Sequence, residues 1–392
     1  RKAAIGKTRY EVGYNAGFST ISRYMKVMNT EEYLQMREEG FANDGKTPTA
    51  TDLDINGTWD KSRNKDWQKE LVGKTARRNR YFASISGGSQ RTSFLLKGTF
   101  EDETTVSPGK MKYGRGSALV NLNHKSGDNK FSANFSAIYS TDNNNAVARD
   151  FYGFAISLPP NMPELRMPDG SLNWNLGPKE NPLRYLQQQY ESHAKNLNAN
   201  LNLEYKILKD LEARLSAGYS DYRLDEQMVE PVSLMYNPAS NISSSANSST
   251  YANVASRGSW NFEPQLNYGK EFGRSSIQLL AGMTFLKSTS GGTTRSASGF
   301  PSDYLIYNFK AALNTNIYSA DDVKYAYSAG FGRLNYNYDG RYILNLTARR
   351  DASSRFGPDN RSANFAAIGG AWIFSKEKFI DRHLPFLNFG KL

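Results

Sequence analysis

Cysteine is absent from this chain of 392 residues, and histidine occurs only at His124, His193 and His383. The lack of cysteine excludes a disulfide framework and thiolate metal sites. The three histidines are scattered without ligand spacing, so they predict neither a metal centre nor a general base. Phosphate-loop, dinucleotide, GxSxG and HExxH signatures are missing as well. We therefore expect no enzyme and no cofactor.

Long hydrophobic runs are also missing, and no stretch reaches the roughly 18 apolar residues that a transmembrane helix needs. The net charge of +11 is spread over predicted strand ends, turns and loops rather than gathered on one face. Such a distribution argues against nucleic acid as a partner. The rim of a membrane barrel beside anionic lipid headgroups would tolerate this excess.

Strict alternation of apolar and polar residues is the dominant pattern that is present. Apolar residues occupy every second position in Leu197–Lys206 and again in Leu211–Tyr219. This period of two predicts strands with one apolar and one polar face. We predict twelve strands, near residues 9–19, 79–87, 91–101, 113–125, 130–140, 195–206, 209–221, 256–270, 275–286, 323–338, 341–350 and 363–373. A thirteenth is expected to begin near Leu387.

The connections between these strands alternate in length. Short turns are expected at residues 87–90, 126–129, 207–208, 271–274 and 339–340. Longer loops lie between them, at residues 20–78, 102–112, 141–194, 222–255, 287–322 and 351–362. This parity is typical of an all-β, antiparallel, up-and-down transmembrane β-barrel of the outer membrane, with short periplasmic turns and long extracellular loops. Residues 20–78 would then be the first extracellular loop.

Local exceptions and helices refine this prediction. The apolar phase changes near Gly332 and Arg333, which predicts a β-bulge, and Pro264 should mark a bulge or a strand end. Asn29 and Glu32 form a capping-box pattern before a helix that runs to Gly40, and Lys376–Asp381 predicts a second short helix. Aromatic residues recur near strand ends, as in interfacial girdles: Tyr10, Tyr139, Tyr219, Trp260, Tyr268, Tyr336 and Tyr338.

Aromatic side chains in the polar loops are the candidate substrate-binding residues, because the C–H faces of sugars pack on rings and a peptide could use the same surface. They are Trp67, Tyr152, Trp174, Tyr236, Tyr251 and Tyr304. For Trp67, packing inside its loop is favoured over stacking on a substrate. Asp142–Asn145 and Asp321–Asp322 could bind Ca²⁺ weakly or be solvated loop groups. Ser353–Gly357 is interpreted as a turn, and Ser240–Thr250 as a mobile loop.

The predicted strands do not make a complete barrel. A barrel removes its edges only by closure, and twelve strands with part of a thirteenth are fewer than the 22 of plugged transporters. No plug-like segment precedes the first strand, and no secretion signal begins at Arg1. We therefore expect the chain to be part of a larger barrel, completed by the same polypeptide or a second chain.

Several motifs resemble the SusC-like (RagA-like) TonB-dependent transporters. Met28–Leu34 with Phe41–Gly45 resembles the first extracellular helix of that family, and so does Asn64–Leu71 followed by Ile85–Ser89. Tyr338–Gly357 resembles the family's most recognisable barrel stretch, which Ala371–Phe379 continues. These matches span nearly the whole chain.

The resemblance implies the following. Family members are 22-stranded outer-membrane barrels with an N-terminal plug, which import oligosaccharides or peptides under a SusD-like surface lipoprotein and draw energy through TonB. Members often pair as dimers. Residues 1–392 would be the N-terminal half of such a barrel, without the plug and TonB box, in the outer membrane of a Gram-negative bacterium of the Bacteroidota.

Two other interpretations stay open. The chain could belong to a structural or secretion-associated surface barrel of the same family that imports nothing. It could also be a soluble, β-rich protein that binds or cleaves glycans. Cleavage would need paired carboxylates that converge in a cleft, and the sequence alone does not reveal such a pair.

Overall fold

The computed structural model describes residues 6–146, 149–177, 180–235, 248–383 and 387–392. Its strands are β1 (Gly6–Ser19), β2 (Ala76–Gly88), β3 (Thr92–Thr104), β4 (Lys112–Lys125), β5 (Phe131–Ala146), β6 (Gln189–Leu208), β7 (Leu211–Glu230), β8 (Ser249–Phe272), β9 (Ser275–Ser298), β10 (Asn314–Tyr338), β11 (Tyr342–Ser353) and β12 (Ser362–Trp372). All twelve predicted strands are therefore present.

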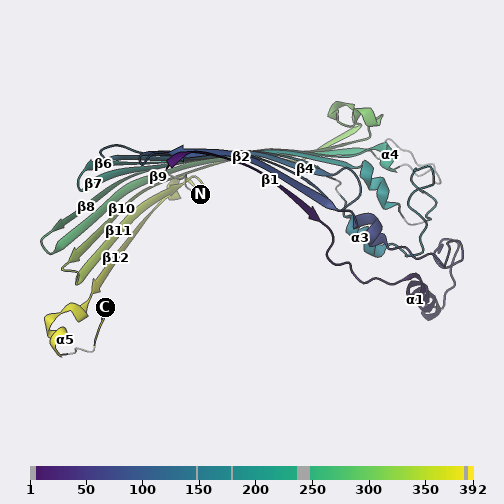
Figure 1. Cartoon of the computed structure of the whole chain (residues 1–392), viewed down its shortest axis with the longest axis horizontal. Coiled ribbons are helices and arrows are strands. Elements are labelled where there is room, and N and C mark those ends of the chain that lie inside the picture. The colour runs from purple at the N-terminus through teal and green to yellow at the C-terminus, as the bar shows by residue number, and fades with distance from the viewer. Residues whose placement is uncertain (1–5, 147–148, 178–179, 236–247, 384–386) are drawn as a thin grey trace.

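The strands form one antiparallel sheet in which each strand pairs with the next along the chain, from β1 to β12. The sheet is a curved wall (Figure 1). Short turns join the strands at one end, and the long connections with α1, α3 and α4 gather at the other (Figure 1). The predicted all-β, up-and-down class is confirmed. We call these two ends the turn end and the loop end.

The helical elements are short and lie in the connections. They are α1 (Thr30–Asn43), α2 (Trp67–Val72), α3 (Phe151–Ser157), α4 (Val232–Met235), α5 (Lys378–His383), η1 (Pro182–Gln187), η3 (Asp303–Leu305), η4 (Phe309–Ala311), η5 (Pro358–Asn360) and η6 (Phe374–Lys376). The Asn29 side chain accepts from the Glu32 amide, and the Glu32 carboxylate accepts from the Asn29 amide, so the predicted capping box is confirmed. The second predicted helix is present as α5, displaced by two residues.

Cross-strand register separates the two faces of the wall. Directly paired residues lie on the same face, so Ala133, Leu203 and Leu215 share one face, and Asn134, Asn202 and Ser216 share the other. We call the first the apolar face and the second the polar face. Val229 and Ala297 have the parity of the apolar face and lie beneath Phe300 and Ile306. That covering segment stands on the convex side of the wall (Figure 1, green), so the polar face is the concave one.

Large apolar side chains remain exposed on the apolar face. Among them are Tyr10, Val12, Leu96, Phe135, Tyr205, Phe262, Leu266, Leu279, Met283 and Ile368. The twelve-stranded wall therefore buries little of its own apolar face. An apolar surface of this extent marks a contact with lipid or with another protein.

The wall contains no bulge at the place where the sequence predicted one. Pairing between β9 and β10 runs without a shift through Gly332 and Arg333, and the irregularity lies between Ile317 and Ser319 instead. The prediction was wrong because it assigned all the aromatic residues of this strand to one face. In the structure Leu334 and Tyr336 lie on the apolar face, whereas Tyr327 and Phe331 lie on the polar face.

Pro264 marks neither a bulge nor a strand end. It is paired with Leu215 on the β7 side, and the register toward β9 has the same offset before and after it. The ladder therefore loses the N–H of one residue and keeps its alignment.

The expected thirteenth strand is present only as its first pair. The backbone N–H of Leu392 donates to the Trp372 carbonyl (2.8 Å), and the Trp372 N–H donates to the Leu392 carbonyl (2.9 Å). No strand is assigned to residues 387–392. The last residue thus meets the turn end of β12 with antiparallel geometry.

Candidate functional site

The polar face is lined mainly by asparagine, serine and threonine. One row across the strands runs through Asn198, Ser220, Ser259 and Ser288, and the Ser220 and Ser259 hydroxyls lie 2.7 Å apart. Amides and hydroxyls both donate and accept hydrogen bonds, so the face can bind water, sugar hydroxyls or peptide groups.

A charged network occupies the loop-end part of the polar face. Cross-strand pairing aligns Arg80, Glu101, Arg115 and Asp142 in one row. Arg78 pairs with Glu101 at 2.7 Å, and Arg115 with Asp142 at 3.5 Å. The alternating signs leave this network nearly neutral, so it orders the wall without creating a field of one sign.

The long loops have a hydrophobic core of their own. It combines Trp59, Trp67 and Leu71 from residues 20–75 with Phe151, Met162 and Leu176 from the β5–β6 connection. Polar bonds join the same two loops: the Trp67 Nε1–H donates to the Pro159 carbonyl (2.8 Å), and the Lys65 amide to the Pro160 carbonyl (2.8 Å). The two loops are therefore packed as one body at the loop end.

Helix α1 is held to its loop by a small charged cluster. Asp54 accepts from Arg37 Nε (2.8 Å) and from the Tyr33 hydroxyl (2.7 Å), and Arg37 also contacts Asp52 (3.1 Å). Burial raises the pKa of Tyr33, and the bond to Asp54 raises it further. Burial opposes ionisation of Asp54, but the bonds from Arg37 and Tyr33 hold the pKa of its carboxyl below the usual value.

The six candidate binding residues lie apart from one another. Trp67 is only 3 % exposed and packs in the loop core, which favours the packing interpretation. Tyr152 is half-buried against that core, and Trp174 is half-buried in the same connection. Tyr251 lies on β8 beside Tyr318 with ring centroids 6.2 Å apart, and Tyr304 is 96 % exposed. Tyr236 lies outside the described residues, as does most of Ser240–Thr250.

The two acidic segments proposed for Ca²⁺ are not loops. Asp142–Asn145 lies within β5 and Asp321–Asp322 within β10. Asp142 is occupied by Arg115 and Tyr113, and Asp322 pairs with Lys324 (3.2 Å). Over the described ranges, no three potential ligands converge on a metal position. His124, His193 and His383 are also separated, each bonded to a different partner.

Aromatic residues on the polar face were missed by the sequence prediction. Phe82 and Phe331 both have polar-face parity, as do Tyr325 and Tyr327. For Tyr325, Tyr327 and Phe331, the signal that could have found them is the apolar phase of 323–338, since a strand without a bulge must place its two halves on opposite faces.

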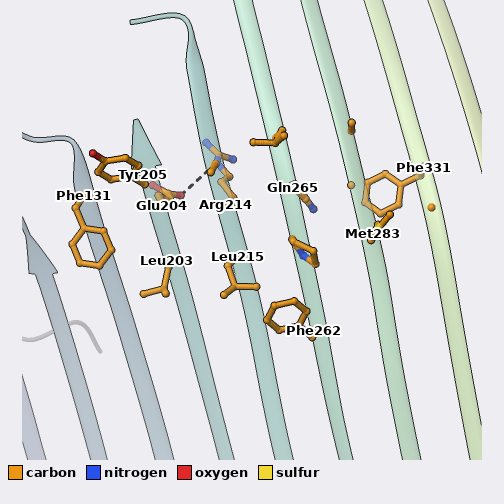
Figure 2. A pocket seen from close by; sticks show the side chains of 16 residues that line it. Phe131, Leu203, Glu204, Tyr205, Arg214, Leu215, Phe262, Gln265, Met283 and Phe331 are labelled. Carbon is orange, nitrogen blue, oxygen red and sulfur yellow. Dashed lines mark ion pairs between the residues drawn. The ribbon is translucent and has the colours of Figure 1, made fainter. Parts of the chain in front are cut away.

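A wide groove lies on the apolar face. It has a volume of about 890 Å³ and is bordered by Phe131, Leu203, Tyr205, Leu215, Phe262 and Met283 (Figure 2). Small residues at Ala213, Ala281 and Gly330 make its floor. Its lining offers almost no hydrogen-bonding groups on this face, so it suits hydrocarbon rather than a polar substrate.

No helix among the described residues is long and apolar enough to cross a membrane.

Comparison with known proteins gives relatives over most of the chain, although no protein-family model matches it. TonB-dependent receptor P3 of Formosa agariphila is 23 % identical over 97 % of this chain, and SusC of Bacteroides thetaiotaomicron is 44 % identical over 13 % of it. These matches cover 37 % of P3 and 5 % of SusC. The similar proteins bear the names of receptors, in line with the expectation that this chain is not an enzyme.

Solved structures give the same fold. A chain of the RagAB peptide transporter superposes with a TM-score of 0.72 at 19 % identity, over 97 % of this chain and 46 % of that one. The chain thus spans less than half the length of the relatives it matches. The motif-based resemblance is confirmed: this chain is similar in sequence to TonB-dependent receptors, SusC among them, and its wall has the fold of the RagAB barrel.

Proposed function

We propose that this chain forms part of the barrel wall of an outer-membrane, TonB-dependent importer. The observation that carries the proposal is the separation of faces: large apolar side chains cover the convex face, and amides and hydroxyls cover the concave one. A barrel in lipid needs this arrangement, since its outside contacts hydrocarbon and its inside contacts water. The names and folds of the relatives support the same function.

The proposed division of the chain follows from this function. Residues 1–392 are the N-terminal half of the barrel, and residues 20–78 form the first extracellular loop. The remaining strands, a plug and a TonB box would be supplied by polypeptide other than these residues, from the same or a second chain. Two copies of the complete protein can pair as a dimer.

The partner and substrate belong to the proposal as well. RagAB is described as a peptide importer, and we propose oligosaccharides or peptides as the class of substrate here. A SusD-like surface lipoprotein would close the loop end, where the packed core of residues 20–75 and the β5–β6 connection offers an ordered docking surface.

Energised uptake tests the proposal. Cells that produce the natural full-length protein with its lipoprotein should take up a fluorescent oligosaccharide or peptide, and deletion of tonB should abolish uptake while surface binding persists. Binding without TonB-dependent uptake would instead support the surface barrel that imports nothing.

Solubility separates both barrels from the third alternative. A soluble glycan-binding protein needs no detergent, whereas the exposed apolar face requires one. Recovery of the natural protein from the soluble fraction, monodisperse without detergent, would refute a membrane barrel.

A further inference from the structure

Two phenylalanine rings on the polar face each reach over a glycine of the neighbouring strand. Phe331 of β10 pairs with Gly282 of β9, and a Cβ added to Gly282 would come within 2.6 Å of the Phe331 Cζ. Phe82 of β2 pairs with Gly13 of β1, and a Cβ there would overlap the Phe82 ring. In both places the glycine leaves room for the ring to rest against the bare backbone of the neighbouring strand.

Each ring carries a cation from the strand on its other side. The Arg349 guanidinium carbon of β11 is 5.4 Å from the Phe331 ring centroid, and the Lys97 ammonium of β3 is 4.6 Å from that of Phe82. Both distances are within cation–π range. We call these two groups the lumenal platforms: Phe331, Gly282 and Arg349, and Phe82, Gly13 and Lys97.

The position of the two platforms contributes little to the folding stability of the wall. A phenylalanine on a water-facing surface loses the hydrophobic gain that the apolar face would give it. Phe365 follows in the same cross-strand row and is 57 % exposed, so further ring surface is available beside Arg349. Flat rings among amides and hydroxyls are the combination that sugar rings bind, with C–H faces on the aromatic ring and hydroxyls on the amides.

The cations beside the two rings favour a ligand of negative charge. Lys97 has no acidic side chain within ion-pair distance in the described part of the wall, and neither does Arg333, which lies two residues beyond Phe331 on the same face. Arg349 pairs with Asp351 (2.6 Å) and contacts the Tyr327 hydroxyl (2.5 Å). These two contacts hold the Arg349 guanidinium group beside the Phe331 ring. Carboxylate or sulfate groups are the natural partners of such cations.

We propose that the lumenal platforms bind an acidic oligosaccharide, each taking the face of one sugar ring on phenylalanine and a carboxylate or sulfate on its cation. The inference rests on the proposed import function and specifies its substrate class. A peptide is the less favoured ligand, because nothing on these rows offers the regular backbone partners that an extended peptide requires.

The test measures binding to the natural full-length protein in detergent. The probes are oligogalacturonate, a sulfated carrageenan oligosaccharide, neutral maltooligosaccharide and an oligoglutamate peptide. We expect at least one acidic sugar to bind about tenfold more tightly than the neutral sugar. Phe331→Ala should weaken that binding about tenfold, and Arg349→Gln should weaken acidic but not neutral sugar. Phe82→Ala and Lys97→Gln should behave in parallel.

Two further variants control for folding. Gly282→Ala keeps every platform side chain but displaces the Phe331 ring, and should also weaken binding. Phe135→Ala removes a ring of the apolar face and should leave affinity unchanged. Absence of binding to both acidic sugars, equal binding of oligoglutamate, or wild-type affinity in Phe331→Ala and Phe82→Ala would overturn the proposal. A lowered melting temperature with unchanged affinity would also overturn it, since the rings would then only pack.

Failure of the acidic-sugar inference can be distinguished from failure of the proposed import function. TonB-dependent uptake of neutral sugar or peptide, unaffected by the platform variants, would remove the inference and leave the import function standing. Loss of energised uptake for every probe would remove the import function itself.

Discussion

Single residues of β6 and β7 distinguish the two faces of the wall. Leu201 and Leu215 lie on the apolar face, and Asn200, which precedes Leu201 on β6, lies on the polar face. Arginine in place of either leucine should cost about 2–4 kcal/mol near the middle of the bilayer, whereas Asn200→Arg should be nearly neutral. Urea unfolding of the protein in lipid vesicles measures the difference. Equal tolerance at the two kinds of position would contradict the assignment of the faces.

Asp54 should make the docking of α1 sensitive to acid. Its folded-state pKa is lowered, so its contribution is complete above the unfolded value of about 3.9 and is lost as the pH falls through the folded value. At neutral pH, Asp54→Asn should weaken docking by about 1–3 kcal/mol, because Arg37 and Tyr33 lose a charged partner.

Hydrogen exchange of the amides of α1 measures that docking. Exchange should be constant between pH 5 and 8, once corrected for the intrinsic rate, and should accelerate only below about pH 4. Asp44→Asn is the matched control, since Asp44 and its partner Lys46 are both well exposed. Faster exchange of α1 on raising the pH toward 8 would contradict the role given to Asp54.

Strand identity could be predicted from the sequence, whereas strand length could not. The sequence alternates clearly only where one face is apolar. The prediction therefore ended β7 at residue 221 and began β8 at residue 256. The structure extends β7 to Glu230 and starts β8 at Ser249. Beyond the apolar band both faces are polar, and backbone pairing continues there without a periodic signal.

The loop core was beyond sequence-based prediction for a different reason. Its central contact joins Trp67 to Pro159, which are 92 residues apart, and no local pattern encodes such a distance. The sequence supplied both interpretations of Trp67, and only the packing of the β5–β6 connection around the ring distinguishes them. The platform of Phe331 was missed because a phase change in its strand was attributed to a bulge rather than to rings on both faces.

Trp67→Ala should loosen the connected loops without unfolding the wall. Removal of a buried tryptophan costs about 3–5 kcal/mol, because the loop core around it would be left with a cavity. Limited proteolysis should then cut residues 20–75 and the β5–β6 connection faster than in the natural protein. Trp67→Phe, which loses the bond to Pro159 but keeps most of the volume, should be intermediate. Unchanged proteolysis with weakened substrate binding would favour stacking on a ligand.

In the proposed barrel, two levels of aromatic residues set the height of the wall across the membrane. On β8 the apolar face carries Trp260, paired with Tyr219, toward the loop end and Tyr268 toward the turn end. Eight residues separate them, roughly 26 Å along the strand, which a tilt of roughly 40° shortens to about 20 Å, comparable to the apolar band of roughly 25 Å of an outer-membrane barrel. The levels are therefore placed as the predicted interfacial girdles require, with the long loops beyond one and the short turns beyond the other.

The absence of cysteine makes the orientation of the whole molecule directly measurable. Tyr304 lies at the loop end and is 96 % exposed, and Asp210 lies in the β6–β7 turn at the opposite end. With the loops outside the cell, Tyr304→Cys should react with a membrane-impermeant maleimide in intact cells. Asp210→Cys should react only after the outer membrane is opened, and the unsubstituted chain should give the background. Labelling of Asp210→Cys but not of Tyr304→Cys in intact cells would show that the opposite orientation is correct. Residues 20–78 would then not lie on the cell surface.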